Sequence, residues 1–173
     1  MNTYKNQQGV GLLEVLVALL LLAISILGFA ALQLRAVEAT TEGVYRVQGI
    51  NLARDLGERI RSNRNSLAEY RTQIQTATNQ LASTKNCYTE LCTSAELADF
   101  DVAQVRKSAD SVGMTFNFLP CQGQNASRAV NAQRHCVYVA WNETSATNGT
   151  DTTACTNGNA YRESSQCIIL EAY

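Results

Sequence analysis

One carboxylate, Glu14, lies at the start of a long apolar stretch, in the segment VGLLEVLVALLLLAI. Residues 15–32, which follow it, contain no charge and have Ser25 as their only hydroxyl. An ionised carboxylate is costly in an apolar environment unless a cation pairs with it, so Glu14 is a candidate functional residue. Two interpretations are open. Glu14 lies at a membrane–water interface and reaches out to water, or it is a functional site within the apolar segment.

The six cysteines are the second set of residues that could do chemistry, and all of them follow residue 86. An even number of cysteines in the polar part beyond a membrane segment predicts disulfides in an oxidising compartment. Six cysteines allow many connectivities, and the sequence does not choose among them. The simplest pairing joins neighbours: Cys87 with Cys92, Cys121 with Cys136, and Cys155 with Cys167. A zinc site is the alternative, but the chain has no CxxC pair and its cysteine spacings are irregular.

The other residues form no catalytic constellation. The only histidine, His135, stands in no nucleophile–base motif, and we expect it on the surface or on an edge strand. No glycine-rich phosphate loop occurs. The 14 Lys and Arg residues nearly balance the 15 Asp and Glu residues, whereas a nucleic-acid-binding protein needs a concentrated basic face. We therefore expect no enzymatic activity, no cofactor, no metal ion and no nucleic-acid partner.

The element that positions Glu14 is a long helix. As a helix, residues 15–32 span about 27 Å, roughly the core of one bilayer. Apolar side chains then recur at helical spacing from Val37 to Ile60, and Asp55 and Arg59 are opposite charges four residues apart. We expect one helix over residues 10–62, apolar all round in its first half. Its second half is amphipathic and must lie against a globular part, which the cysteines place outside the cytoplasm.

Shorter helices and a sheet are expected after residue 62. Apolar residues from Leu67 to Leu81 indicate a second helix, and Thr93 with Glu96 forms a capping box before a third, ELADFDVAQVRKSA. Period-two alternation in MTFNF, HCVYVAW and QCIILEAY predicts an antiparallel sheet with one buried face. Residues 142–165 form a Thr-, Asn- and Gly-rich loop before the last strand, and loops of this length are usually functional or mobile.

The start of the chain closely resembles the class III leader of type IV prepilins and type II secretion pseudopilins. QQG ends at Gly9, Val10 follows, and Glu14 is the fifth residue counted from Val10. In that family a dedicated membrane peptidase cuts on the cytoplasmic side after the glycine and methylates the new amino terminus, here Val10. Phe or Met is commoner at that position. The resemblance implies that Glu14 of one subunit neutralises the terminal amine of a neighbour in the core of a filament.

Two stretches, VGLLEVLVALLLLAISILGFAALQ and CTSAELADFDVAQV, resemble minor pilins of the PilV type, the type IV pilus modification protein family. The resemblance is strong over residues 7–62, fair over 92–105 and weak elsewhere. It implies an α+β, pilin-like fold, in which a long N-terminal helix packs on a small antiparallel sheet braced by disulfides. It also implies a non-enzymatic protein that is held in the bacterial inner membrane with its C-terminal part periplasmic, and that later lies at or near the pilus tip.

The partners that this resemblance implies are the prepilin peptidase, the inner-membrane assembly platform, the major pilin and other minor pilins. Such sets of minor pilins prime pilus assembly, support twitching motility and adhesion, and can carry a tip adhesin. The expected parts are then a cleaved leader (1–9), a transmembrane and assembly half-helix (10–35), an amphipathic half-helix (36–62) and a periplasmic head (63–173).

Two alternatives to the minor pilin are open. The first is a minor pseudopilin of a type II secretion system, which has the same leader. The second is a membrane-anchored periplasmic binding protein or enzyme that never polymerises. Gly9 and Glu14 have no role in a plain anchor, which disfavours the second alternative.

Overall fold

The computed structural model describes residues 10–76, 78–124 and 133–172, so Gly9 and the rest of the predicted leader lie outside the described residues. Contacts within the chain divide it into two units, one up to Gly43 and one from Val44 onward. The predicted first helix is confirmed as α1, Val10–Ser62, whose residues belong to both units. The unit from Val44 onward is called the head below.

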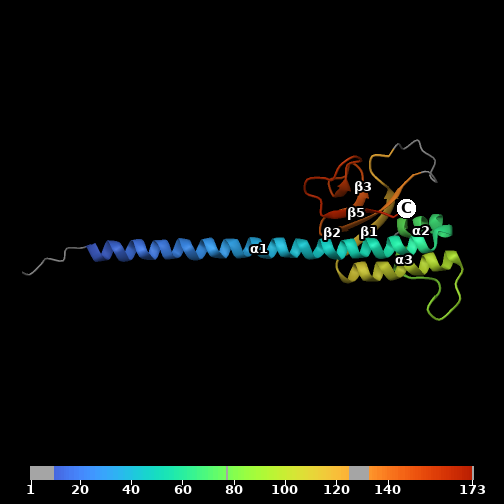
Figure 1. Cartoon of the computed structure of the whole chain (residues 1–173), viewed down its shortest axis with the longest axis horizontal. Coiled ribbons are helices and arrows are strands. Elements are labelled where there is room, and N and C mark those ends of the chain that lie inside the picture. Colours follow the sequence, from blue (N-terminus) through green and yellow to red (C-terminus); the bar gives the residue numbers. More distant parts are fainter. Residues whose placement is uncertain (1–9, 77, 125–132, 173) are drawn as a thin grey trace, which may run out of the picture. The chain divides into compact units, whose positions relative to one another are not determined.

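The head is an α+β structure, as the sequence predicts (Figure 1). After α1 come η1 (Arg64–Ser66), α2 (Leu67–Gln75), η2 (Asn79–Leu81), α3 (Ser94–Ser111), β1 (Met114–Pro120), β2 (His135–Trp141), β3 (Ser145–Asn148), β4 (Ala154–Thr156) and β5 (Cys167–Glu171).

The two short helices follow their local signals. The capping box before α3 is confirmed, because Thr93 Oγ1 accepts from Glu96 N and Glu96 Oε2 accepts from Thr93 N at 2.7 Å. The second helix is shorter than predicted and ends at Gln75. The backbone turns to an extended conformation at Thr76 (φ −104°, ψ 103°), and Leu81 belongs to the separate turn η2.

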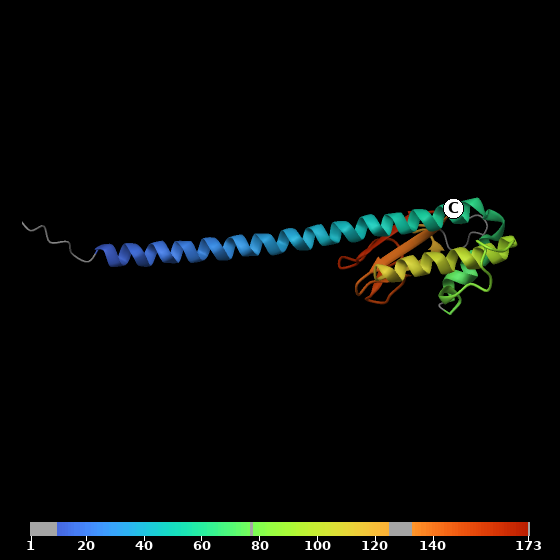
Figure 2. The ribbon, with the colours of Figure 1, turned by 90° about the horizontal axis from the view of Figure 1, so that it is seen from below.

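The three predicted strands form one antiparallel sheet in the order β1-β2-β5. Met114 pairs with Trp141, and Cys136 pairs with Glu171, so β2 is the central strand. α3 runs beside the last turns of α1, and both helices pack with α2 on one face of the sheet (Figure 2). The main core that results contains Leu52, Leu56, Ile60, Tyr70, Ile74, Val102, Val105, Met114, Phe116, Phe118, Val137, Val139 and Trp141.

The expectation of a single buried face is wrong for the central strand. All seven residues of β2 are buried, because residues 142–166 fold back over the second face of the sheet. The predicted loop in this segment contains β3 and β4, which pair in parallel. Ala146 and Cys155 of the segment join Tyr138 and Ala140 of β2 in a second, smaller core.

All six cysteines form disulfides. The pairs are Cys87–Cys92, Cys121–Cys136 and Cys155–Cys167, the same as the pairing of neighbours. Cys121–Cys136 joins the residue after β1 to the start of β2, and Cys155–Cys167 joins β4 to β5. The second of these bonds therefore fastens the covering segment to the sheet.

His135 is not a surface residue, contrary to the expectation from the sequence. Its side chain is buried at the start of the central strand, and its ring centroid lies 5.3 Å from that of Phe118. Burial lowers the pKa of His135, and the positive charge of Arg71 lowers it further. The histidine is thus a neutral packing residue, and its strand is covered on both faces.

α1 packs closely on the sheet at a glycine. A Cβ atom added to Gly49 would lie 3.3 Å from Cζ3 of Trp141 and 3.4 Å from Cδ1 of Ile168. One turn earlier, the ring of Tyr45 stacks on Trp141, with ring centroids 6.3 Å apart. Gly49 therefore sets the distance at which α1 packs on β2 and β5.

We predict that Gly49→Leu destabilises the head by about 1–3 kcal/mol, because the added side chain overpacks the contact with Trp141. Thermal unfolding of the full chain in detergent, followed by the near-ultraviolet circular dichroism of the aromatic core, measures the change. Gly43→Leu is the matched control, since nothing lies within 4 Å of a Cβ at that helical position. Equal unfolding temperatures for the two variants would contradict the prediction.

Candidate membrane and assembly surface

The part of α1 up to Gly43 exposes its apolar side chains. Leu12 is 74% exposed and Leu27 is 71% exposed, and the large apolar residues between them are exposed as well. By length and composition, α1 could cross a membrane. A surface of this kind needs lipid or other apolar helices around it.

The hydroxyl groups of this part of α1 are satisfied within the helix. Ser25 Oγ donates to Leu21 O at 2.8 Å, and Thr40 Oγ1 donates to Ala36 O at 2.8 Å. A helix that enters an apolar phase must satisfy its polar groups internally, and these two hydroxyls meet that requirement. Charged residues resume at Arg35, which pairs with Glu38 (Nη1–Oε2 3.0 Å).

Glu14 differs from these groups because it has no internal partner. Its side chain is exposed on α1, and the described part of the chain offers it no hydrogen bond or ion pair. Val10, the predicted first residue after cleavage, is the first residue of α1. The structure therefore brings Val10 and Glu14 onto neighbouring turns of one helix, with the carboxylate available to a cation from outside the chain.

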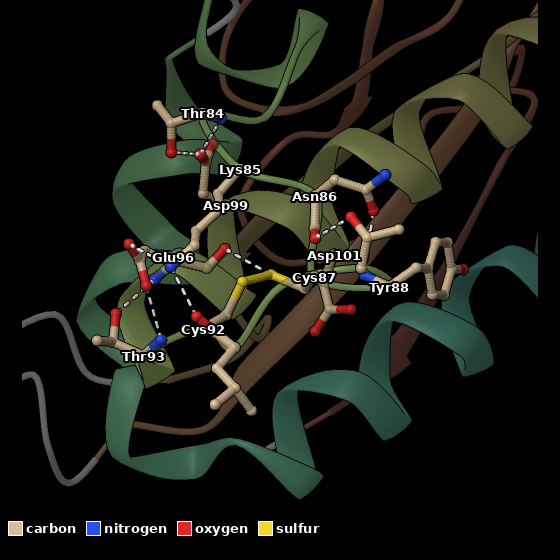
Figure 3. The surroundings of a disulfide bond; sticks show 12 residues. Thr84, Lys85, Asn86, Cys87, Tyr88, Cys92, Thr93, Glu96, Asp99 and Asp101 are labelled. Atoms are coloured by element: carbon tan, nitrogen blue, oxygen red, sulfur yellow. Dashed lines mark hydrogen bonds and ion pairs between the residues drawn. A yellow bond between two sulfur atoms is a disulfide. The ribbon is translucent and has the colours of Figure 1, made fainter.

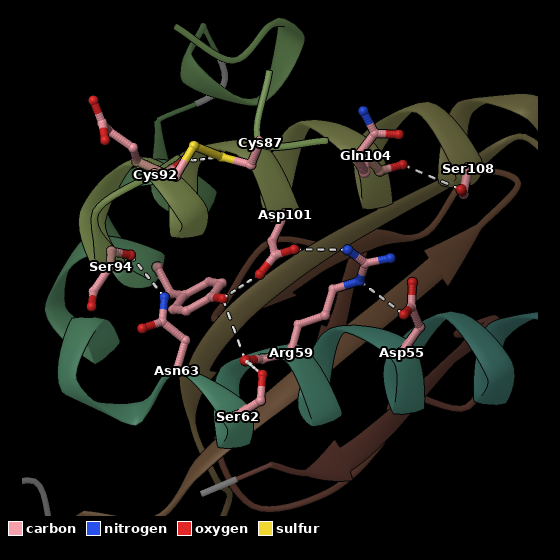
Figure 4. Close-up of polar contacts among 12 residues, drawn as sticks. Asp55, Arg59, Ser62, Asn63, Cys87, Cys92, Ser94, Asp101, Gln104 and Ser108 are labelled. Atoms are coloured by element: carbon pink, nitrogen blue, oxygen red, sulfur yellow. Dashed lines mark hydrogen bonds and ion pairs between the residues drawn. A yellow bond between two sulfur atoms is a disulfide. The ribbon is translucent and has the colours of Figure 1, made fainter. Parts of the chain in front are cut away.

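The last turns of α1 are held in the head by a buried polar network (Figure 4). Arg59 Nη1 donates to Asp101 Oδ1 at 2.7 Å, and Arg59 Nε donates to Asp55 Oδ1 at 2.8 Å. Tyr70 Oη donates to Asp101 Oδ2 at 2.5 Å. Burial and the charge of Asp101 raise the pKa of Tyr70, so its hydroxyl keeps its proton as the donor. α1, α2 and α3 thus meet at one carboxylate whose side chain is only 8% exposed.

A second polar contact holds α1 to the end of the sheet. Arg61 Nε donates to Ala172 O at 3.0 Å, and Arg61 Nη2 donates to Glu171 O at 3.1 Å. These carbonyls belong to the end of β5 and the residue after it, so the guanidinium satisfies backbone acceptors where the sheet stops. Gly57 lets α1 approach the same point, with a Cβ position 3.5 Å from that of Ala172.

Two family profiles match the chain. One, described as type IV pilin Tt1218, matches residues 31–103, and the other, described as the prokaryotic N-terminal methylation motif, matches residues 4–30. The chain is thus similar to a type IV pilin over residues 31–103. No curated protein and no solved structure matches it significantly.

The two matches bear on activity and processing. The match to a type IV pilin supports the expectation of a structural, non-enzymatic protein. Its methylation motif covers Gly9, Val10 and Glu14, and a leader of this kind implies processing by a prepilin peptidase. The apolar helix and the motif together point to anchoring in the inner membrane and to a pilus. Within the described ranges, no group of three or more His, Cys, Asp and Glu side chains could hold a metal ion.

The pilin-like head also has a braced loop before α3 (Figure 3). The Cys87–Cys92 disulfide closes the loop, and the backbone N and Oγ1 of Thr84 both donate to Asp99 Oδ2 at 2.8 Å. Lys85 Nζ lies 3.5 Å from Glu96 Oε1, which joins the loop to the capping box of α3.

Sequence reasoning found part of the polar network and missed its centre. The pair of Asp55 and Arg59 is expected from its spacing and is present. Asp101 was not expected to join them, although it occupies a position on the apolar side of α3, three residues after Ala98 and four before Val105. A carboxylate in an apolar register predicts a buried partner, and this signal could have found Asp101.

We predict that Asp101→Asn destabilises the head by about 1–3 kcal/mol, because Arg59 and Tyr70 lose a shared charged partner. Tyr70→Phe should cost about 1 kcal/mol, and the double variant should cost less than the sum, since both changes remove one contact. Denaturant unfolding of the full chain in detergent measures all three.

Asp110→Asn is the matched control for this prediction. It breaks the ion pair of Arg106 and Asp110 on the same helix, where the aspartate side chain is 51% exposed. The expected loss there is below about 1 kcal/mol. An Asp101→Asn variant that is no less stable than Asp110→Asn would rule out the buried network as an anchor.

Proposed function

We propose that this chain is a minor type IV pilin of the PilV type, which helps to prime pilus assembly and lies at or near the pilus tip. The observation that carries the proposal is the exposed apolar helix with one unpaired carboxylate, Glu14, within the span of the N-terminal methylation motif. The long pilin-like match over residues 31–103 and the disulfide-braced head support it.

The proposed assembly step depends on charge pairing. Cleavage after Gly9 leaves a positive amine on Val10 at the end of an apolar helix. Glu14 of a neighbouring subunit neutralises this amine when the two helices are in register. Because an unpaired charge in the apolar core is expensive, the pair favours insertion at the correct register and opposes extraction of one subunit.

In this proposal the head supplies the specificity for partners. Residues 142–165 form much of the cover over the second face of the sheet, and the Cys155–Cys167 disulfide fastens that region to β5. Other minor pilins and the major pilin contact the head, and the minor-pilin set can carry a tip adhesin. The prepilin peptidase and the inner-membrane assembly platform act on the chain before it enters the filament, and the assembled pilus supports twitching motility and adhesion.

We predict that clean deletion of the gene in the native host abolishes or strongly reduces surface pili and twitching while exoenzyme secretion stays normal. Pili, twitching zones and secreted exoenzymes are measured side by side, and the gene is supplied in trans as the control. Lost secretion with normal pili would show that the chain is a minor pseudopilin of a type II secretion system, and the pilus proposal would fail.

We predict that Glu14→Ala lowers the amount of this chain in sheared filaments at least tenfold, because the terminal amine loses its partner in the apolar core. Quantitative immunoblots of sheared pili and membranes measure the distribution. Glu38→Ala is the matched control, since it removes a carboxylate of the same helix that already pairs with Arg35. Amino-terminal sequencing should find methyl-Val10 in both variants. If a processed Glu14→Ala chain enters filaments at the normal level, the charge-pairing step is wrong.

A further inference from the structure

The loop closed by Cys87–Cys92, called the docking loop below, holds large apolar side chains out in solvent. Leu91 is 95% exposed, more than any other large apolar residue in the described parts of the chain. Tyr88 is 76% exposed, and Glu90 is exposed between the two. A head with a buried core has no need to expose Leu91 for its own folding, so this side chain is available to a partner.

The docking loop is ordered before any partner arrives. Its disulfide fixes both ends, and Lys85 Nζ donates to Leu91 O at 2.6 Å (Figure 3). Asn86 Oδ1 accepts from Tyr88 N at 3.0 Å, and the ring of Tyr88 meets Phe100 edge-on, with ring centroids 4.9 Å apart. A loop held in this way loses little conformational entropy on binding, which favours a specific contact.

The same head carries a groove that matches this loop in size and charge. The groove lies between η2 and α3 and has a volume of about 380 Å³, within the range of small binding pockets. It is lined by Leu81, Ala82, Ser83, Ala103, Gln104, Arg106, Lys107 and Asp110.

Of the two cations that line the groove, Lys107 has no ion pair with any described residue. Arg106 is neutralised by Asp110 and also donates to Gln80 Oε1 at 3.1 Å. Lys107 is exposed, and no carboxylate among the described residues forms an ion pair with it. Leu81, which is 69% exposed, adds an apolar wall. The groove therefore presents apolar surface beside one positive charge, which complements a loop that presents Leu91 beside Glu90.

We propose that the docking loop of one copy of this chain binds in the groove of a second copy, with Leu91 against Leu81 and Glu90 opposite Lys107. The loop precedes Ser94 at the start of α3, whereas Lys107 lies about 20 Å further along that helix. Copies that run parallel must therefore be offset by about 20 Å along α3. The contact is heterologous, since each pair leaves one loop and one groove open. It goes beyond the proposed function and is argued from the head alone.

A photo-crosslink tests the contact in the full chain within the membrane. Two copies with different tags are expressed together, and p-benzoylphenylalanine replaces Leu91 in one of them. We expect a crosslinked dimer whose joined peptide in the second copy lies within residues 81–83 or 103–110. The same probe at Glu163, an exposed residue, is the control. Crosslinks from position 91 that map elsewhere, that capture a different protein, or that do not exceed the control would overturn the proposal.

Charge reversal tests the orientation of the same contact. Glu90→Lys in the probe-bearing copy should lower the yield of crosslinked dimer about threefold to tenfold, and Lys107→Glu in the second copy should do the same. With one reversal in each copy, the yield should return to near the parent level, since the opposite charges face each other again. Glu163→Lys in the probe-bearing copy is the matched control. Failure of the combined reversals to restore the yield would overturn the pairing.

The outcomes separate this contact from the proposed function. If pili are lost on deletion and position 91 gives no specific crosslink, the pilin function holds and the docking contact fails. If the mapped crosslink appears and pili are normal without the gene, the contact stands as self-association in the membrane and the pilin function fails.

Discussion

The packing of the end of α1 on the sheet is the contact on which the head depends. Leu52, Leu56 and Ile60 form one wall of the main core, and Gly49 sets the distance to Trp141. α2 and α3 complete that core against the same wall. Arg59 and Arg61 then satisfy a buried carboxylate and the carbonyls at the end of the sheet, so the polar contacts hold the same geometry.

The disulfides act on a different part of the structure. The main core is apolar and helix-covered, whereas the second core rests on a segment rich in Thr, Asn and Gly that buries few large side chains. Such a segment gains little from hydrophobic burial. The Cys155–Cys167 cross-link restricts its unfolded state and offsets that weakness, whereas Cys121–Cys136 ties together the two strands that the segment covers. The third bond, Cys87–Cys92, lies outside both cores and orders a surface loop instead.

Local patterns predicted much of this fold, and long-range packing accounts for the rest. The bounds of α1, the capping box of Thr93 and Glu96, and three strands follow from periodicity and capping within short windows. The burial of both faces of β2 could not be predicted, because it depends on a distant polar segment that folds back over the sheet. The position of His135 was misjudged for the same reason. Asp101 was missed because its partners come from two other helices. The functional residues also differ in how far the sequence predicts them. Glu14 is recognisable from the sequence alone, whereas the groove beside α3 exists only once η2 packs against that helix.

Glu14 differs from the acidic residues of the head in what surrounds its carboxylate. Asp99 accepts from Thr84, Glu96 closes the capping box, and Asp101 holds Arg59 and Tyr70. Carboxylates without such partners in the head, such as Glu90, are exposed where water solvates them. Glu14 has no partner in the described part of the chain. It also directly precedes residues 15–32, an uncharged span in which water would not solvate a carboxylate once lipid or other helices surround it. Once that span is surrounded by lipid or by other helices, the carboxylate requires a cation that this chain does not place beside it. A neighbouring subunit with a free terminal amine supplies such a cation, so the residue that is costly in an isolated helix becomes favourable in an assembly.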